Sequence, residues 1–414
     1  MRVVIAPDKF KGSLSAPEVA DRLAAGLRNG FTASQPGAGI EATLIPVADG
    51  GEGTLDAAVG SGFTRRSATV TGPTGQPVTA QFAVRGDEAV IEMAAASGLA
   101  VLPGFAEGTA PNPDTAKSAT SLGTGELIRA ALDLGCRHII LGVGGSANTD
   151  GGAGVLQGLG AVLLDADGQE LPGGGAALAR LDRIDLSNLD VRLEAAEFVL
   201  ASDVDNPLLG RTGAPAIFGP QKGATPDDVA SLEAALANFV QVLADEIGSG
   251  AKDAATAPGA GAAGGVGYIA IAALNATRRP GIDVVLEFTE LERRLAGADL
   301  VITGEGSLDE QSLLGKTPMG VARAAARSGI PVIAVCGRST LSPKELSESG
   351  FESVHALTDL EASIEKCIAE AGPLLEELGR HIGVRLSQIS ESIQDPSEST
   401  QDTARTDSKE HVNV

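Results

Sequence analysis

Short apolar runs and helical repeats of apolar residues alternate along most of this chain. Residues 2–6 are almost entirely apolar, which is typical of a parallel strand covered on both faces. Ser15 and Glu18 then form a capping-box pattern, and apolar residues recur at helical spacing up to Leu27. A second strand is predicted at 43–47, before a glycine-rich turn and a short helix. The chain therefore begins with a β-α-β-α pattern.

The periodicity changes near residue 65, where three short alternating runs predict an antiparallel meander. Helices and strands alternate again after it, which predicts further α/β structure. The expected strands lie at 67–70, 78–84, 89–93, 138–143, 198–201, 300–303 and 332–335, and the expected helices at 124–134, 226–247, 290–295, from 317 onward, and from 360 to about 388.

The length predicts two or three domains, because 414 residues are too many for one core, and the order of elements favours two. The simplest arrangement is a discontinuous domain of residues 1–64 and 293–388 that holds an inserted mixed α/β domain of residues 65–292. Residues 389–414 are rich in Ser, Thr, Asp, Glu and Gln and poor in apolar side chains. This segment is expected to be a disordered acidic tail without a catalytic part.

Composition narrows the class of protein further. Hydrophobic residues make up 43% of the chain but aromatic residues only 3%, which favours helix-on-sheet packing through small aliphatic side chains. The net charge of −23 disfavours nucleic acid and anionic membranes as partners, although local lysines can still bind a phosphate. Three cysteines without metal-ligand spacing suit a reduced, cytoplasmic environment. The uncharged stretch 254–277 contains proline and several glycines, and is interpreted as a loop leading into a short buried helix.

Five predicted strands end in loops of similar composition, where glycines accompany Asp or Glu and often Ser, Thr or Lys. In open α/β sheets, ligands bind beyond the carboxyl ends of strands. Glycine allows close approach of the backbone, and carboxylates can hold Mg²⁺, so the combination suits a polyphosphate and phosphoryl transfer. The loops are 8–13, 49–53, 144–152, 202–206 and 304–310.

Each loop also has a simpler interpretation. An Asp-Gly pair is usually a turn, and an Asp at a helix start, as Asp203 could be, is usually a cap. Lys9 and Lys11 would be interpreted as solvated surface lysines if they did not directly follow a buried strand. Named motifs are excluded, because Glu310 stands where a P-loop needs its first glycine and no strand precedes the GxGxxG match at 259–264. The four histidines lie outside these loops, which disfavours a histidine triad or a zinc site.

Taken in order, these loops resemble the signatures of the type 1 glycerate kinase family (glycerate 2-kinase), over Val4 to about Gly379. The resemblance implies a flavodoxin-like, doubly wound parallel-sheet domain built from both chain ends, a second inserted domain, and an active site in the cleft between them. It also implies ATP, Mg²⁺ and D-glycerate, most often with 2-phosphoglycerate as product. The matching segments are 5–14, 49–54, 202–208, 218–223 and 303–312.

One departure from the family pattern is the order Asn148-Thr149, where Thr-Asn is usual. If these side chains touch the ligand, substrate preference or rate would change. Asp203 is the first candidate to orient or deprotonate the acceptor hydroxyl, and Asp309 is the second.

Further roles are assigned by residue type. The candidate catalytic residues are Asp203, Asp309 and Lys9, and the candidate metal ligands are Glu305, Asp309 and Asp49. The candidate substrate- and phosphate-binding residues are Asp8, Lys11, Ser13, Asp49, Gly50, Gly51, Glu52, Ser146, Asn148, Asp150, Asn206, Lys222, Gly304, Gly306 and Lys316.

Several functions remain open at this point. The leading hypothesis is an ATP-dependent kinase of D-glycerate acting at the 2-hydroxyl. The alternatives are a kinase acting at the 3-hydroxyl, a kinase of another small hydroxy acid such as tartronate or a sugar acid, and a non-catalytic nucleotide or metabolite sensor. A dehydrogenase is disfavoured because no dinucleotide fingerprint is present. A homodimer is among the assemblies left open.

Overall fold

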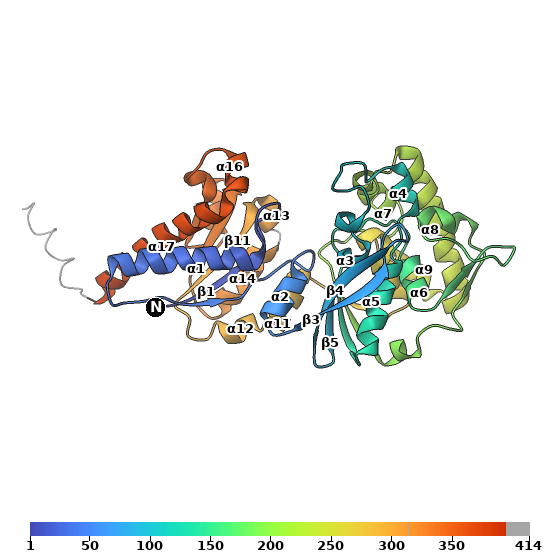
Figure 1. Cartoon of the computed structure of the whole chain (residues 1–414), viewed down its shortest axis with the longest axis horizontal. Helices are drawn as coiled ribbons and strands as arrows, with labels where there is room; N and C mark the ends of the chain where they lie inside the picture. Colours follow the sequence, from blue (N-terminus) through green and yellow to red (C-terminus); the bar gives the residue numbers. More distant parts are fainter. Residues whose placement is uncertain (314, 395–414) are drawn as a thin grey trace, which may run out of the picture. The chain divides into compact units, whose positions relative to one another are not determined.

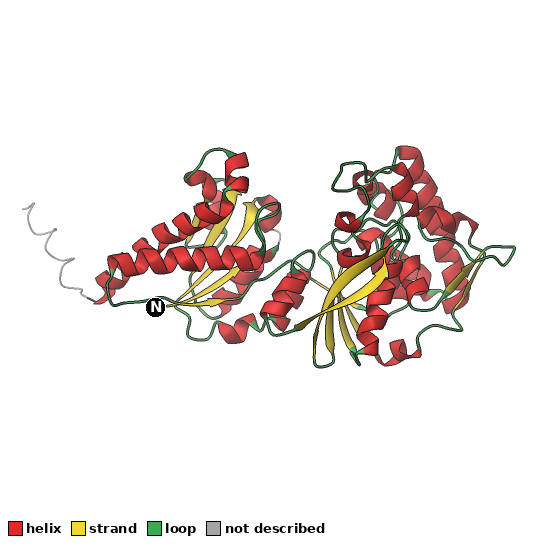
Figure 2. Ribbon diagram, viewed as in Figure 1, coloured by secondary structure: helices red, strands yellow, loops and turns green. Residues whose placement is uncertain are grey.

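The computed structural model describes residues 1–313 and 315–394, and it has an α/β fold throughout (Figures 1 and 2). The chain divides into two compact units. Unit 1 consists of Met1–Pro46 and the chain from Glu292 onward, and unit 2 is Val47–Leu291. Residues 47–64, expected in the first domain, belong to unit 2 because α2 (Thr54–Gly60) contacts strand β5 and helix α11 of that unit.

The sheet of unit 1 is entirely parallel and has the order β13-β12-β11-β1-β2. Numbered along unit 1, this is the flavodoxin-like order 2-1-3-4-5. The central pair joins the two ends of the chain, since Ala6 is paired with Thr303. The strands are β1 (Arg2–Pro7), β2 (Glu41–Leu44), β11 (Leu300–Leu308), β12 (Val332–Ser339) and β13 (Ser353–Ala356).

Helices cover both faces of this sheet. On one face α1 (Ala16–Ser34) and α17 (Ala371–Gln394) lie side by side (Figure 1), and their backbones approach closely. A Cβ added at Gly26 would lie 2.0 Å from the Glu376 carbonyl oxygen, so this crossing requires glycine. The other face is contacted by α14 (Thr317–Arg327). The shorter helices are α12 (Leu291–Arg294), α13 (Glu310–Leu313), α15 (Pro343–Glu348) and α16 (Ile364–Ala369).

The main sheet of unit 2 is mixed, with the order β10-β9-β6-β5-β4-β3. The predicted meander is confirmed, because β3, β4 and β5 pair antiparallel, while β5, β6, β9 and β10 are parallel. The strands are β3 (Thr64–Thr71), β4 (Pro77–Arg85), β5 (Glu88–Glu92), β6 (His138–Gly142), β9 (Glu197–Ala201) and β10 (Thr277–Arg279), with a separate antiparallel pair β7 (Val162–Leu164) and β8 (Arg183–Asp185).

The core of unit 2 is built mostly from aliphatic side chains, with a few rings such as Phe82, Phe239 and Tyr268. The predicted amphipathic helix is α8 (Pro226–Ile247), which begins at the Thr225 capping box. The uncharged stretch ends in the buried helix α10 (Val266–Ala272), as expected. The other helices are α3 (Ala94–Ser97), α4 (Pro113–Ser118), α5 (Leu122–Asp133), α6 (Ala153–Gly158), α7 (Ala214–Phe218), α9 (Gly250–Thr256) and α11 (Gly281–Phe288).

Some predicted boundaries were wrong. The second strand is Glu41–Leu44 rather than 43–47, and β11 continues through residues 304–308, which were expected to be loop. The pairing of Gly304 and Glu305 with β12 explains this extension. Residues 389–394 continue α17, whereas residues 395–414 of the expected tail lie outside the described residues. No helix in the described parts of the chain combines the length and apolarity needed to cross a membrane.

Candidate active site

The carboxyl ends of β1 and β11 bring two predicted acidic residues of unit 1 together. Asp8 follows β1, and its backbone N–H donates to the Gly304 carbonyl at 2.8 Å. Its Oδ2 accepts a hydrogen bond of 2.7 Å from Thr317 Oγ1, and its Oδ1 accepts one of 2.6 Å from the Lys9 backbone N–H. Lys9 Nζ lies 3.8 Å from the same carboxylate. Because β1 and β11 are where the strand order reverses, these residues lie at the edge where such sheets bind ligands.

Glu305 lies on β11 beside this point and is half-buried. Burial raises the pKa of its carboxyl to about 7, with Asp8 and Asp309 adding to the rise, and Ser312 and Lys316 opposing it. Its Oε1 is buried and has no hydrogen-bond partner among the described residues. A buried oxygen without a donor is costly unless a ligand supplies one.

Four other predicted residues of unit 1 differ in their surroundings. Asp309 caps α13, since its Oδ1 accepts from the Ser312 backbone N–H at 3.1 Å. Ser13 Oγ donates to the Ile368 carbonyl at 2.9 Å, which gives that hydroxyl a structural partner. Lys11 is exposed. Gly306 lies against the 10–11 loop, because a Cβ on it would be 3.2 Å from the Lys11 backbone nitrogen.

In unit 2, the glycines of the 49–53 loop lie against the carboxyl ends of the parallel strands. A Cβ added at Gly142, the end of β6, would lie 2.5 Å from the Gly50 carbonyl oxygen. One added at Gly50 would lie 2.6 Å from Gly281 Cα and 3.3 Å from the Ala201 side chain. The backbone of Gly50 and Gly51 therefore lies at the strand ends, where the predicted site residues of this unit begin.

Asp203 follows β9 at this edge, and its Oδ1 accepts a 2.8 Å hydrogen bond from the backbone N–H of Gly281. Gly281 is the first residue of α11, so the carboxylate meets the positive end of a helix. The residue is solvent-accessible as a whole, but partial burial of its carboxyl raises the pKa to about 6, and Asp49 and Asp283 add to the rise. The Gly281 N–H and Arg278 oppose it.

A second loop of unit 2 is anchored by a buried lysine. Lys222 is 2% exposed, and its Nζ donates to Ser146 Oγ at 2.7 Å and to the Asn148 carbonyl at 2.5 Å. Burial lowers the pKa of this amine to about 7, although Asp150 acts against the change. Asp150 is also buried and accepts from the backbone and hydroxyl of Ser121 at 2.7 and 2.9 Å. Lys222 and Asp150 therefore hold the 144–152 loop in place.

The departure at Asn148-Thr149 lies inside the protein. Both side chains are fully buried, and Asn148 Nδ2 donates to Asp150 Oδ1 at 2.8 Å and to the Ala263 carbonyl at 3.1 Å. Asn148 Oδ1 and Thr149 Oγ1 have no hydrogen-bond partner within the described residues. The exchange thus alters the packing of the loop rather than a surface group.

The remaining predicted residues are spread more widely. Asn206 Nδ2 donates to the Thr212 carbonyl at 2.8 Å and so closes its own loop, and Glu52 is exposed. Of the predicted metal ligands, Asp49 belongs to unit 2 and Glu305 and Asp309 to unit 1. In residues 1–313 and 315–394, no three His, Cys, Asp or Glu side chains are grouped to hold a metal by themselves.

Sequence reasoning missed Thr317, Arg278 and Gly281. Thr317 was interpreted only as a helix start, and it also holds Asp8. Arg278 lies on a strand of three residues, too short to give a period. A usable signal was the Arg-Arg-Pro-Gly sequence that ends the uncharged stretch at 278–281.

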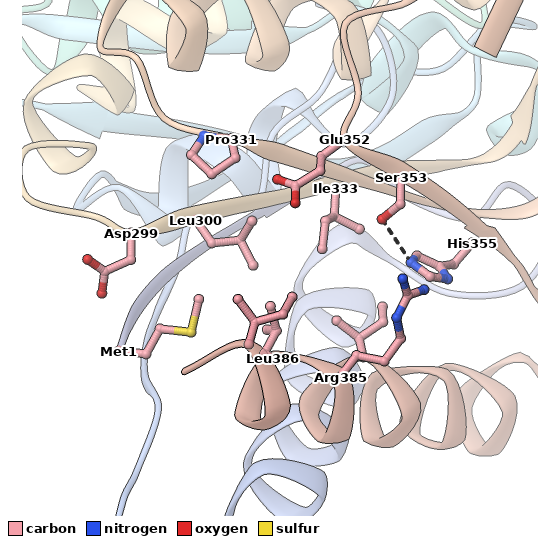
Figure 3. A pocket seen from close by; sticks show the side chains of 12 residues that line it. Met1, Asp299, Leu300, Pro331, Ile333, Glu352, Ser353, His355, Arg385 and Leu386 are labelled. Atoms are coloured by element: carbon pink, nitrogen blue, oxygen red, sulfur yellow. Dashed lines mark hydrogen bonds between the residues drawn. The ribbon is translucent and has the colours of Figure 1, made fainter. Parts of the chain in front are cut away.

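Two cavities lie away from all of these residues. One, of about 480 Å³, is at the amino-terminal ends of the unit 1 strands under α17, where Leu300, Ile333 and Leu386 form an apolar floor (Figure 3). Ser353 and His355 form a 3.0 Å hydrogen bond at its rim. The other, of about 660 Å³, is in unit 2 near residues 186–199. Neither is lined by a predicted site residue.

Comparisons with a family profile, with known sequences and with a solved structure all match almost the whole chain. The profile of the glycerate kinase family matches residues 3–387. A glycerate kinase of Bacillus subtilis is 43% identical over 389 residues, covering 93% of this chain and 98% of that protein. The glycerate 2-kinase of Escherichia coli is 42% identical over 390 residues, covering 94% and 98%. A crystal structure assigned as glycerate kinase 2 from Salmonella typhimurium superposes with a TM-score of 0.78 at 42% identity, covering 94% of this chain and 99% of that one.

Proposed function

Since this chain belongs to the glycerate kinase family, a family of phosphotransferases with an alcohol group as acceptor, we propose that it transfers the γ-phosphoryl group of ATP to the 2-hydroxyl of D-glycerate. The observation that carries the proposal is Asp203. Its carboxylate lies at the strand ends of unit 2, its pKa is raised to about 6, and it is therefore an ionised base of increased strength at neutral pH.

The residues present fit a nucleotide and Mg²⁺. Glu305 has a buried oxygen for which the described residues supply no donor, and Lys316 lies near enough to lower its pKa. Magnesium is usually held by one or two carboxylates together with phosphates and water, so a protein cage of three acids is not required. Glu305, Asp309 and Asp49 are the proposed ligands, and a bound Mg²⁺ would neutralise charge on the β- and γ-phosphates.

The remaining side chains are proposed to bind and orient the substrates. Lys9, Lys11 and Lys316 would neutralise phosphate oxygens, and the backbone at Gly50 and Gly51 would supply neutral donors where no side chain intervenes. Asp8, held by Thr317, fixes the position of Lys9.

The proposed chemical step is an in-line displacement. Asp203 takes the proton of the acceptor hydroxyl as that oxygen bonds to the γ-phosphorus, and the bond from this phosphorus to the β–γ bridging oxygen breaks. The products are ADP and 2-phosphoglycerate, with the proton on the Asp203 carboxyl before it passes to water. The buried lysine Lys222, whose Nζ donates to Ser146 Oγ and the Asn148 carbonyl, is proposed to hold the loop and not to act on phosphate.

Phosphorus NMR of the product of ATP and D-glycerate tests the proposal. A phosphate on the 2-hydroxyl couples to one carbon-bound hydrogen and gives a doublet, whereas one on the 3-hydroxyl couples to two. A product phosphorylated at the 3-hydroxyl would contradict the position. Turnover of tartronate or a sugar acid without turnover of D-glycerate would support the alternative kinase, and nucleotide binding without ADP release on any acceptor would support the sensor.

A further inference from the structure

An arginine that neither the proposed chemistry nor the sequence analysis uses lies beside Asp203. Arg278 is on β10, the strand paired with β9, and its Nη2 donates to the Val204 carbonyl at 3.2 Å, one residue from Asp203. Its charge lowers the pKa of Asp203 against the effect of burial. Within the described residues, Arg278 is the only cation that contributes to this pKa; the other charged contributors are Asp49 and Asp283.

The stem of Arg278 is held in one position. Gly259 lies flat against it, since a Cβ added there would be 2.7 Å from Arg278 Cδ and 2.9 Å from Nε. Gly259 has a φ of +87°, so a side chain at this position is disfavoured by both the backbone and the contact. Arg278 Nε is buried and finds no acceptor in the described part of the chain. This is the glycine loop whose GxGxxG pattern had no assigned function.

The guanidinium of Arg278 has N–H groups that can still donate to a ligand. Nη2 donates to the Val204 carbonyl and lies 2.7 Å from Asp205 Oδ1. The Asp205 side chain is 78% exposed, and exposed ion pairs of this kind contribute little. Arginine has five N–H donors in a planar fork that suits a carboxylate. The next residue on the same strand, Arg279, is paired with Glu287, and the buried Lys222 donates to Ser146 Oγ and the Asn148 carbonyl.

Binding of the acceptor carboxylate beside Asp203 requires a cation. In glycerate, the carbon with the 2-hydroxyl also carries the carboxylate, so a base that takes the 2-hydroxyl proton has the substrate carboxylate as its neighbour. Asp203 and Asp49 would repel that charge. We infer that Arg278 binds the carboxylate of the acceptor and so sets the choice of the 2-hydroxyl, which is one carbon closer to the carboxylate than the 3-hydroxyl is. This inference rests on the proposed function.

The test compares D-glycerate with its uncharged amide, D-glyceramide, in the full-length protein. In Arg278→Gln we expect KM for D-glycerate to rise roughly tenfold to a hundredfold, the range of a charge-assisted hydrogen bond, with a smaller change in kcat. The preference for D-glycerate over D-glyceramide should fall by the same factor. The matched control is Arg279→Gln, on the same strand, which should keep the wild-type preference. Calorimetric binding of D-glycerate should weaken only in Arg278→Gln.

Asp205→Asn keeps the inference falsifiable if Arg278→Gln does not fold. It removes the carboxylate that competes for Arg278, and we expect KM for D-glycerate to fall by about twofold to fivefold with that for D-glyceramide unchanged. An unchanged preference in Arg278→Gln, or in Asp205→Asn, would overturn the role of Arg278. A wild-type protein that does not phosphorylate D-glycerate at all would instead overturn the proposed function.

Discussion

At the residue scale, burial shifts the pKa values of two ionisable groups of unit 2 in opposite directions, and each shift favours the neutral form of the group. The pKa of Asp203 rises to about 6 and that of Lys222 falls to about 7, because both charged forms lose hydration. Their surroundings separate the two roles. Asp203 is solvent-accessible at a strand end, whereas Lys222 is buried and binds the 144–152 loop. A shifted pKa therefore identifies a catalytic candidate only together with access to a substrate.

Replacing Asp203 with Asn should lower kcat by a factor of about 10² to 10⁴, because a general base contributes that much. The melting temperature should change little, since Asn can still accept the Gly281 N–H. Steady-state kinetics and thermal denaturation of the same preparation check this expectation. Near-normal turnover in the variant would remove Asp203 from the mechanism.

The pH profile of kcat/KM should report the same carboxyl. Activity should fall as pH drops through about 6, because Asp203 becomes protonated and can no longer accept a proton. Asp283→Asn removes a negative charge that raises this pKa, so the acidic limb should move to lower pH. An unmoved limb would mean that another group titrates.

Lys222 should make stability depend on pH. Its pKa is about 7 in the folded protein and 10.5 ordinarily, so between these values the unfolded chain binds the extra proton. The free energy of unfolding should therefore rise with pH from about 7 to 10, by up to about 1.4 kcal/mol per unit, and be flat in this respect below 7. Urea denaturation of Lys222→Met should lack this rise, and the exposed-site control Lys252→Met should retain it. Equal slopes in both variants would contradict the assignment.

The sequence located most candidate residues but not their contacts. Asp8, Asp203 and Glu305 were found because each follows or extends an apolar strand, which fixes the edge where it lies. Thr317 and Arg278 were missed because their partners are remote in the chain, at Asp8 and at residues 204–205. Such contacts depend on which strands become neighbours, and that information is not local.

At the element scale, the short helix α11 sets the geometry around Asp203. Its first residue, Gly281, donates to Asp203 and also meets the 49–51 loop, since an added Cβ would lie 1.9 Å from the Asp49 carbonyl oxygen. Periodicity predicted neither the loop's neighbours nor the extension of β11 through 304–308. A segment rich in glycine, such as residues 304–306, is predicted to be a loop when the strand with which it pairs is unknown.

Gly281→Ala should therefore displace the 49–51 loop. We expect a loss of about 1–3 kcal/mol in the free energy of unfolding, typical of overpacking, together with at least a tenfold loss of kcat/KM. Gly250→Ala is the control, because a Cβ there meets nothing within 4 Å and alanine favours the helix it begins. Denaturant titration and kinetics measure both. An active and stable Gly281→Ala protein would show that the loop position is not critical.

At the scale of the whole molecule, the strand order of unit 1 and the meander of unit 2 follow from periodicity and from the family resemblance together. The insertion point was placed too late, at 64 instead of 46, because the first β-α-β-α pattern looks continuous. The last helix of this pattern, α2, belongs to unit 2 because it packs against β5 and α11. Contacts of this kind have no signature in a local pattern of apolar residues.

A chain that ends after Gln394 should keep full activity. The family match stops at residue 387, and the sequence of 395–414 contains few apolar residues. We expect kcat, KM and the melting temperature to stay within experimental error of the full-length values. A lower kcat, a higher KM or a lower melting temperature in the truncated protein would contradict this expectation and show that the tail contributes to activity or stability.

The pairing of β1 with β11 also constrains how this protein is made. At about 5–20 residues per second, the ribosome needs roughly 12–50 s to add the intervening Val47–Leu291 segment. By the end of that interval all the strands of the inserted unit have been made, whereas one edge of β1 still lacks its neighbour β11. During synthesis, the amino-terminal segment therefore exposes a strand edge that can pair with other chains. We expect chaperones to bind the nascent chain mainly within its first 46 residues.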